Sequence, residues 1–212
     1  MWRVSGLALW LFAAAPLAAQ WSAGVEVGTL RFGGSAIDTS TPNDPHRARP
    51  SPSTSYEVRV QRDFGKIGVG IGVLYSKSGV GVETATITVE ERSLAKFYAI
   101  APEVSFLVAK PGPGGALRLR AGPSFDRWAL TGGDTTWRVG ARAAVSLDWP
   151  LGGPWIGILQ AGATVSECVF DVEDLPPGFV RSATWRRAVS VGIALRPGSA
   201  PTRPPASAGA SP

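Results

Sequence analysis

Residues that could act as nucleophiles, general bases or metal ligands are scarce in this sequence. It contains a single histidine, His46, and a single cysteine, Cys168. His46 lies near Asp44 and Ser51, and acyl hydrolysis would need such residues as base, orienting acid and nucleophile. Their segment, NDPHRARPS, has a loop composition that rarely preorganises a site. One histidine and one cysteine do not complete a zinc shell. We therefore predict no catalytic residue, no metal, no cofactor and a non-enzymatic protein.

Carboxylate and guanidinium groups form the larger set of chemically active side chains. They alternate with apolar residues, and those on the polar face are Glu26, Glu57, Arg59, Glu103, Arg118, Arg120, Asp126, Arg138, Arg142 and Asp148. Buried charges are tolerated only when they are paired. Antiparallel folding about the intervening turns gives three opposite-charge pairs: Glu103 with Arg120, Asp126 with Arg138, and Arg118 with Asp148. We predict that these side chains form an internal charge network.

The segments that must position these charges have the period of β-strands. Thr135–Trp149 alternates apolar and polar residues, with a tryptophan near each end of its apolar face. It is long enough to cross a bilayer, which takes about 9–11 tilted strand residues. The same alternation recurs in Trp21–Thr29, Tyr56–Gln61, Ile67–Tyr75, Leu94–Ala109, Leu117–Asp126, Trp155–Val165 and Trp185–Leu195. The pattern predicts an all-β fold, an eight-stranded antiparallel up-and-down transmembrane β-barrel.

The connections between these segments alternate in length. Gly33–Ser53, Ser78–Ser93 and Glu167–Ala183 are long and polar, whereas the turns between them, such as KPGPGG, are short. Thr131–Asp134 is the exception, because it is short where the alternation calls for a long connection. Outer-membrane barrels have short periplasmic turns and longer external loops. We expect loops at the long connections, although Thr84–Val89 could extend a strand. Pro102 and Pro123 lack backbone donors and fall opposite one another, which predicts one local break in pairing.

Energetics decide which face of the strands points inward. An arginine such as Arg142 facing lipid near mid-depth costs roughly 2–4 kcal/mol. An eight-stranded barrel is just wide enough to be filled by its own side chains. We therefore predict a plugged, salt-bridged lumen and a structural or surface-interaction role. The alternatives are a soluble exported barrel that binds an apolar ligand, which would need the faces reversed, a narrow pore, and a lipid-modifying enzyme.

Aromatic and basic residues gather near the predicted strand ends. Trp and Tyr prefer membrane–water interfaces, and we assign that position to Trp21, Tyr56, Tyr75, Tyr98, Trp128, Trp137, Trp149, Trp155 and Trp185. Basic residues near the external ends could contact lipopolysaccharide phosphates, or could be solvated or snorkelling side chains. These possible contacts are Lys96, Arg181, Arg186 and Arg187. Outer-membrane lipid, lipopolysaccharide and an unidentified extracellular or periplasmic protein are the expected partners.

The two ends of the chain differ from the rest. Residues 1–19 combine Arg3, an apolar run and a small-residue cleavage site, which predicts a cleavable signal peptide and export to the bacterial outer membrane. Residues 20–196 form the predicted barrel domain. Residues 197–212 are rich in proline and alanine, which predicts a disordered tail. The net charge of +5 is spread without a Lys/Arg run, so we expect no nucleic-acid partner.

Three short stretches resemble a known family. YAIAPEVSF at Tyr98–Phe106, AGPSF at Ala121–Phe125 and the final AVSVGIALRP are similar to bacterial outer-membrane β-barrel domain proteins of the small OmpA-like and PorT-like kind. The resemblance covers roughly Gln20–Pro197 and implies the barrel architecture, with no shared catalytic set. One departure concerns the closing strand, which in such proteins often ends the chain on an aromatic residue. Here it ends Leu195-Arg196 and a tail follows.

Overall fold

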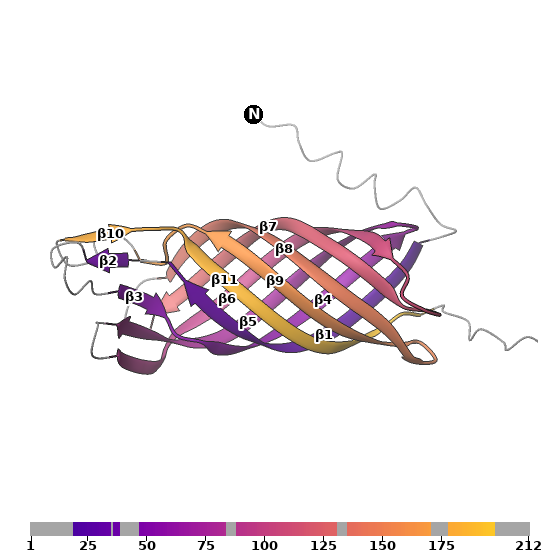
Figure 1. The fold of residues 1–212 in the computed structure, drawn as a ribbon, viewed down its shortest axis with the longest axis horizontal. Coiled ribbons are helices and arrows are strands. Elements are labelled where there is room, and N and C mark those ends of the chain that lie inside the picture. Colours follow the sequence, from indigo (N-terminus) through magenta and orange to yellow (C-terminus); the bar gives the residue numbers. More distant parts are fainter. Residues whose placement is uncertain are drawn as a thin grey trace, which may run out of the picture.

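The barrel consists of long antiparallel strands that close on themselves (Figure 1). The computed structural model describes residues 19–34, 36–38, 47–83, 88–130, 135–170 and 178–197. Its barrel strands are β1 (Ala19–Gly33), β4 (Ser53–Phe64), β5 (Ile67–Glu83), β6 (Thr88–Ala109), β7 (Ala116–Leu130), β8 (Thr135–Gly152), β9 (Trp155–Ser166) and β11 (Thr184–Leu195). Each pairs with the next, and β11 pairs with β1 to close the cylinder. The predicted eight-stranded antiparallel barrel is confirmed.

The two ends of the cylinder differ in their connections. At one end, which we call the short-turn end, β4 meets β5 through a tight turn in which Phe64 pairs with Ile67 and Gly65 has a φ of 68°. That turn needs a residue that tolerates positive φ, which glycine does without steric cost. β1 begins and β11 finishes at the same end (Figure 1). The other end, which we call the long-loop end, carries the long connections, as the sequence predicts.

The long-loop end has more β-structure than the sequence predicts. The outer parts of β5 and β6 pair with each other as far as Glu83 and Thr88, after a register shift between Ser78 and Val80. The prediction of a loop over Ser78–Ser93 is therefore wrong for most of that segment. Three short strands lie beside this hairpin in the order β10-β2-β3-β5: β2 (Ala36–Asp38), β3 (Arg47–Pro50) and β10 (Phe179–Arg181). In the hairpin of β5 and β6, valine and threonine are common in residues 80–89, and such residues favour strands even in polar segments.

The two prolines lie at one interruption of the β6–β7 ladder. Paired residues stop at Ile100 and Phe125 and resume at Val104 and Ala121 in the same register, which leaves Pro102 and Pro123 opposite each other in the gap. The predicted local break is present. The backbones come close at this point, because a Cβ atom on Gly122 would lie 2.0 Å from the carbonyl oxygen of Pro102.

The apolar and charged faces of the strands point as predicted. On β8, Val139 is 56% exposed on the outside, whereas Arg142 is 8% exposed and points into the lumen. The outer face of the other strands is likewise apolar and exposed, with Val25, Val58, Ile71, Val104, Leu119, Leu159 and Val191 among its members. The soluble alternative needs these faces reversed, and the structure gives the opposite arrangement.

Several sequence predictions concern residues outside the described ranges. These are residues 1–18 of the signal peptide, residues 198–212 of the tail, the connection Thr131–Asp134, and the side chains of Asp44 and His46. Within the described ranges, no helix is long and apolar enough to span a bilayer.

Candidate functional site

The lumen of the barrel holds a buried network of charges, and Arg59 lies at its centre. Its guanidinium group contacts carboxylates from three strands: Glu26 on β1, Glu57 on β4 itself at 2.5 Å, and Glu103 on β6 at 2.9 Å. Each of these four side chains is 5% exposed or less. In the low-dielectric interior, a guanidinium group with several carboxylate partners is held in one orientation. The network therefore links the walls of the barrel across its interior.

Two further arginines extend this central cluster to the opposite wall. Arg120 on β7 binds Glu103 at 2.8 Å, the contact that folding about the KPGPGG turn predicts. Arg142 on β8 donates to both carboxylate oxygens of Glu57, at 3.1 and 2.9 Å. Such two-pronged contacts are the strongest that arginine makes with a carboxylate. Glu57 and Glu103 thus each bridge Arg59 to a second arginine.

Glycines on β5 make room for the central cluster. Gly72 lies opposite Arg59, and a Cβ atom there would sit 2.6 Å from Glu57 Oε1. A Cβ atom on Gly68 would lie 2.5 Å from Asp63 Oδ1 and 2.5 Å from Ser105 Oγ. Small residues on this wall therefore allow the long charged side chains of the facing walls to fill the interior.

A small cavity lies inside the middle of the barrel. The interior cavity beside Arg59, Gln61, Arg120 and Asp148 has a volume of about 20 Å³. A space of that size accommodates about one water molecule.

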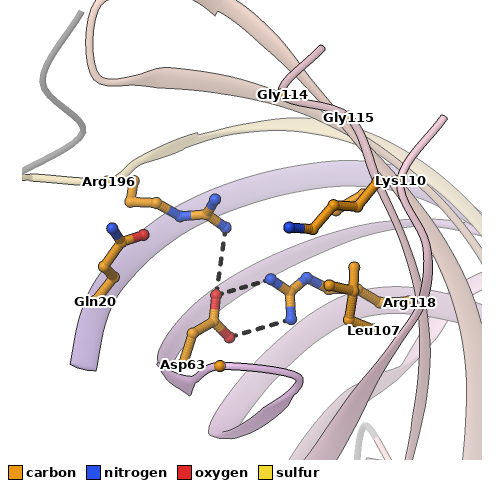
Figure 2. Close-up of a pocket in the computed structure, with 10 residues that line it drawn as sticks. Gln20, Asp63, Leu107, Lys110, Gly114, Gly115, Arg118 and Arg196 are labelled. Atoms are coloured by element: carbon orange, nitrogen blue, oxygen red, sulfur yellow. Dashed lines mark hydrogen bonds and ion pairs between the residues drawn. The ribbon is translucent and has the colours of Figure 1, made fainter. Parts of the chain in front are cut away.

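A larger cavity of about 380 Å³ opens at the short-turn end (Figure 2). Arg118 binds Asp63 at 2.9 Å and Asp148 at 3.2 Å, so the predicted contact of Arg118 with Asp148 is present. Arg196 also reaches Asp63, at 3.4 Å, and Lys110 extends into the same cavity (Figure 2). The sequence analysis missed Asp63 and Arg196. Asp63 could have been found, because it shares its strand face with Glu57 and Arg59.

Arg186 carries the network toward the long-loop end. It binds Asp126 at 3.0 Å and donates to Ser124 and Thr164, and its guanidinium group lies 4.6 Å from the ring centre of Phe97. The prediction that Arg186 contacts lipopolysaccharide is therefore wrong, because the residue is 4% exposed and lies in the lumen. Successive strand residues point to opposite sides. Even-numbered residues of β11 face inward.

Arg138 differs from its prediction in its partner. It lies opposite Asp126 in the β7–β8 register, as folding about the connecting turn predicts. Its guanidinium group donates to the backbone carbonyl oxygens of Cys168 at 2.6 Å and Val169 at 3.4 Å. It thereby ties the segment after β9 to the mouth of the barrel. The carboxylate of Asp126 instead accepts from Arg186.

An apolar layer lies inside the barrel beyond Arg186. Phe32, Phe97 and Trp128 pack together with ring centres 4.5 to 6.2 Å apart, surrounded by Leu30 and Leu74. The prediction of Trp128 as a membrane-interface residue is wrong, because it is 2% exposed and lies inside. It occupies the same face of β7 as the lumen arginines. The sequence analysis missed this apolar layer, although strand alternation places every member on the lumen side.

The other predicted interface aromatics lie on the outer surface. Trp21, Tyr56, Trp137, Trp155 and Trp185 are exposed, and Tyr75, Tyr98 and Trp149 are half-buried. Tyr56, Tyr75 and Tyr98 occupy successive positions across β4, β5 and β6, and the rings of Tyr75 and Tyr98 are 5.1 Å apart. Lys96, Arg181 and Arg187 are exposed at the long-loop end. No cluster of His, Cys, Asp and Glu suited to a metal occurs in the described ranges.

Comparison with known proteins identifies the fold of this chain but assigns it to no family. No protein-family model and no curated protein matches the sequence. Among solved structures, Neisserial surface protein A matches with a TM-score of 0.54 and 9% identity, over 84% of this chain and 99% of that one. AlkL in lipid bilayers matches with a TM-score of 0.48 and 13% identity, over 86% and 93% of the two chains. A major outer membrane protein from Thermus thermophilus matches with a TM-score of 0.47 and 13% identity, over 85% and 100%.

The match to Neisserial surface protein A gives this chain the fold of small outer-membrane β-barrels. At that identity the likeness extends to the fold alone. Membership of the OmpA-like or PorT-like families stays a prediction.

Proposed function

We propose that this protein is a non-enzymatic integral barrel of the bacterial outer membrane, exported by a cleavable signal, with a closed lumen. The short-turn end faces the periplasm and the long-loop end faces outward. The observation that carries the proposal is the succession of two barriers along one lumen, the Arg59 ion-pair cluster and the apolar layer of Phe32, Phe97 and Trp128.

The outer surface supports insertion in a membrane. Large apolar side chains are exposed on every barrel strand, including Val27, Ile67, Phe106, Val145 and Ile193. Soluble monomers rarely expose contiguous apolar patches larger than a few hundred Å². Trp and Tyr residues near both ends of the strands lie where an aromatic belt is expected. The loop lengths support the orientation, since outer-membrane barrels have their short turns on the periplasmic side.

The lumen supports a role other than transport. A path for solute would have to cross the central ion pairs, where removing either partner leaves an unpaired buried charge. It would then have to cross the aromatic layer, where Phe97 is 0% and Trp128 is 2% exposed. An ion cannot pass such an apolar layer without losing its hydration. The described side chains therefore favour a closed barrel over a narrow pore.

The long-loop end supports a surface-interaction role. The extension of β2, β3, β10 and the outer hairpin of β5 and β6 has its own small core of Ala36, Ala48, Cys168 and Phe170. Such a core holds the projecting strands in a fixed arrangement. Binding residues commonly lie on the loops that a rigid scaffold presents.

Conductance in planar bilayers tests the closed lumen. We expect the refolded wild-type protein to insert and to show no steady single-channel current. Opening both barriers together, with Trp128→Ala and Arg59→Ala, should produce a measurable current if the variant folds. Trp137→Ala, which alters an exposed tryptophan of the neighbouring strand, serves as the matched control. A steady wild-type current comparable to that of the double variant would contradict the proposal.

A further inference from the structure

The outer surface of the barrel shows two like-charge pairs at the long-loop end. Arg31 on β1 lies directly opposite Arg187 on β11, and Lys77 on β5 lies opposite Lys96 on β6. All four side chains are exposed. Like charges placed directly opposite on neighbouring strands repel each other and destabilise the pairing. An arrangement of this kind is stabilised when an anion lies between the two cations.

No carboxylate of the described chain neutralises these cations. The buried acids on the barrel strands point into the lumen, where they pair with arginines. Among the side chains that the structure describes, Glu167 is the single exposed carboxylate. Arg31 and Arg187 have no ion-pair partner in the described part of the chain.

The pair of Arg31 and Arg187 differs from the lysine pair because an apolar groove leads up to it. The groove has a volume of about 410 Å³ and is lined by Val25 and Val27 of β1, Tyr56 of β4, and Val191 and Ile193 of β11. β1 and β11 lie side by side there (Figure 1). Val25 is opposite Ile193, and Val27 is opposite Val191. The side chains that line the groove are thus mainly apolar, as contact with a hydrocarbon chain requires.

A second, more polar hollow lies further along β1 toward the long-loop end. It has a volume of about 320 Å³ and is lined by Thr29 and Arg31 of β1 together with Pro52, Ser53 and Thr54. Along the outer face of β1 the order is Val25, Val27, Thr29, Arg31, which passes from apolar to polar to cationic. A lipid has the same order of groups, from acyl chain to polar headgroup to phosphate.

We propose that Arg31 and Arg187, with the groove below them, form a binding site for one phosphorylated glycolipid of the outer leaflet, the lipid A part of lipopolysaccharide. The phosphate lies between the two guanidinium groups, and one acyl chain lies along Val27 and Val191. Arginine suits this role because its planar fork matches phosphate oxygens. The proposal rests on the proposed function, because it requires the long-loop end to reach the outer leaflet.

Native mass spectrometry of the full-length protein, folded in detergent micelles with purified lipid A, tests the site. We expect wild type to retain one lipid A molecule and Arg31→Gln/Arg187→Gln to bind about tenfold more weakly or worse, from the loss of charge-assisted hydrogen bonds. Lys66→Gln/Lys110→Gln removes the same number of cations at the short-turn end and should bind like wild type. Arg31→Lys/Arg187→Lys, which keeps the charge but loses the fork, should be intermediate.

Two further probes identify the ligand. Lipid A stripped of its phosphates, and phosphatidylglycerol, should each bind wild type no better than lipid A binds the Arg31→Gln/Arg187→Gln variant. The proposal is overturned if the double glutamine variant keeps lipid A as wild type does. It is also overturned if phosphate-free lipid A or phosphatidylglycerol binds equally well.

Gel migration with and without boiling separates this proposal from the function on which it rests. Folded membrane barrels migrate differently when unboiled. A wild-type protein that inserts into vesicles as a folded barrel but shows no preference for lipid A contradicts the lipid site alone. A wild-type protein that stays in solution without lipid or detergent contradicts the proposed function instead.

Discussion

Arg186 and Arg187 are neighbours in the sequence, yet they lie on opposite faces of β11. Arg186 is buried in the lumen, with Asp126 as its ion-pair partner and Phe97 beneath its guanidinium group. Arg187 is exposed on the outside, where it lies opposite another arginine, Arg31. The same contrast holds for the two faces of the whole barrel. Among the side chains that the structure describes, the carboxylates on the barrel strands gather inside with arginines, whereas the outer face of these strands at the long-loop end carries cations.

This difference shows that the surroundings of an arginine decide its role. Inside, a guanidinium group has lost its hydration and depends on protein partners. Outside, it stays hydrated and is free to bind a ligand. Substitutions at matched positions on the two faces should therefore have different consequences, and the following four predictions run from the largest expected effect to the smallest.

Removing the buried arginine should be the most damaging change. Arg186→Met leaves Asp126 as an unpaired buried charge and should lower the free energy of unfolding by about 3–5 kcal/mol. Arg187→Met should change it by less than about 0.5 kcal/mol, because the side chain is exposed. Urea unfolding of the refolded protein in detergent micelles or vesicles measures both. Equal effects of the two substitutions would contradict the assignment of faces.

Placing a charge on the outer face at mid-barrel should be the next most damaging. Val145→Arg puts a guanidinium group into the lipid-facing belt, and we expect a loss of about 2–4 kcal/mol in vesicles. Val145→Ala should cost much less, because it keeps the surface apolar. The same urea titration in vesicles provides the measurement. A Val145→Arg protein as stable as wild type would mean that this face is in water.

Adding a methyl group where Pro102 and Pro123 interrupt the β6–β7 pairing should lower the free energy of unfolding moderately. Gly122→Ala would bring a Cβ atom into the carbonyl oxygen of Pro102, 2.0 Å away in the present backbone. Overpacking of this kind costs about 1–3 kcal/mol. Gly33→Ala is the control, because a Cβ atom there has open space around it. Unfolding midpoints that fall equally for the two variants would show that the β6–β7 approach is looser than described.

Relieving the repulsion between the outward-facing cations should have the smallest effect. It should stabilise the protein, whereas the preceding three changes destabilise it. In detergent without lipopolysaccharide, Arg187→Gln should raise the free energy of unfolding by a few tenths of a kcal/mol, less than about 0.5 kcal/mol. High salt should shrink the gain, because screening already weakens the repulsion between exposed charges. Lys96→Gln should behave alike, since Lys96 faces Lys77. A destabilised Arg187→Gln protein at low salt would show that Arg187 has an intramolecular partner.

Much of the barrel could be predicted because strand alternation is a local signal. The period of two in Thr135–Trp149 already gives the strand, its faces and the inward position of Arg142. The pairs of Glu103 with Arg120 and of Arg118 with Asp148 can be predicted by counting residues outward from the connecting turn on the two neighbouring strands. Such counting works when the turn is tight and both strands are regular.

Two side-chain positions are predicted wrongly because nearness to a strand end is a weaker signal than odd–even alternation, which decides the face of a strand on which a residue lies. The position of Trp128 near a strand end predicts a membrane-interface residue, but Trp128 is an even-numbered residue of β7, as are Arg118 and Arg120, and its side chain lies in the lumen. Arg186 is likewise included among the possible lipopolysaccharide contacts because it lies near the external end of its strand, but its side chain is buried in the lumen. The extra strands at the long-loop end could not be predicted by alternation, because their pairing depends on segments far apart in the sequence.

Thiol accessibility along one strand tests the central claim most directly. In a Cys168→Ser background, Ser146→Cys places a thiol in the lumen with little change of size, and Val145→Cys places one on the outer face. In vesicles, we predict that a membrane-impermeant thiol reagent leaves both unmodified, whereas a lipid-soluble maleimide modifies Val145→Cys and not Ser146→Cys. Both should react fully after denaturation. Rapid reaction of Ser146→Cys with the impermeant reagent would show an open aqueous lumen, and rapid reaction of Val145→Cys with it would place the apolar face in water. Either result would contradict a closed barrel set in lipid.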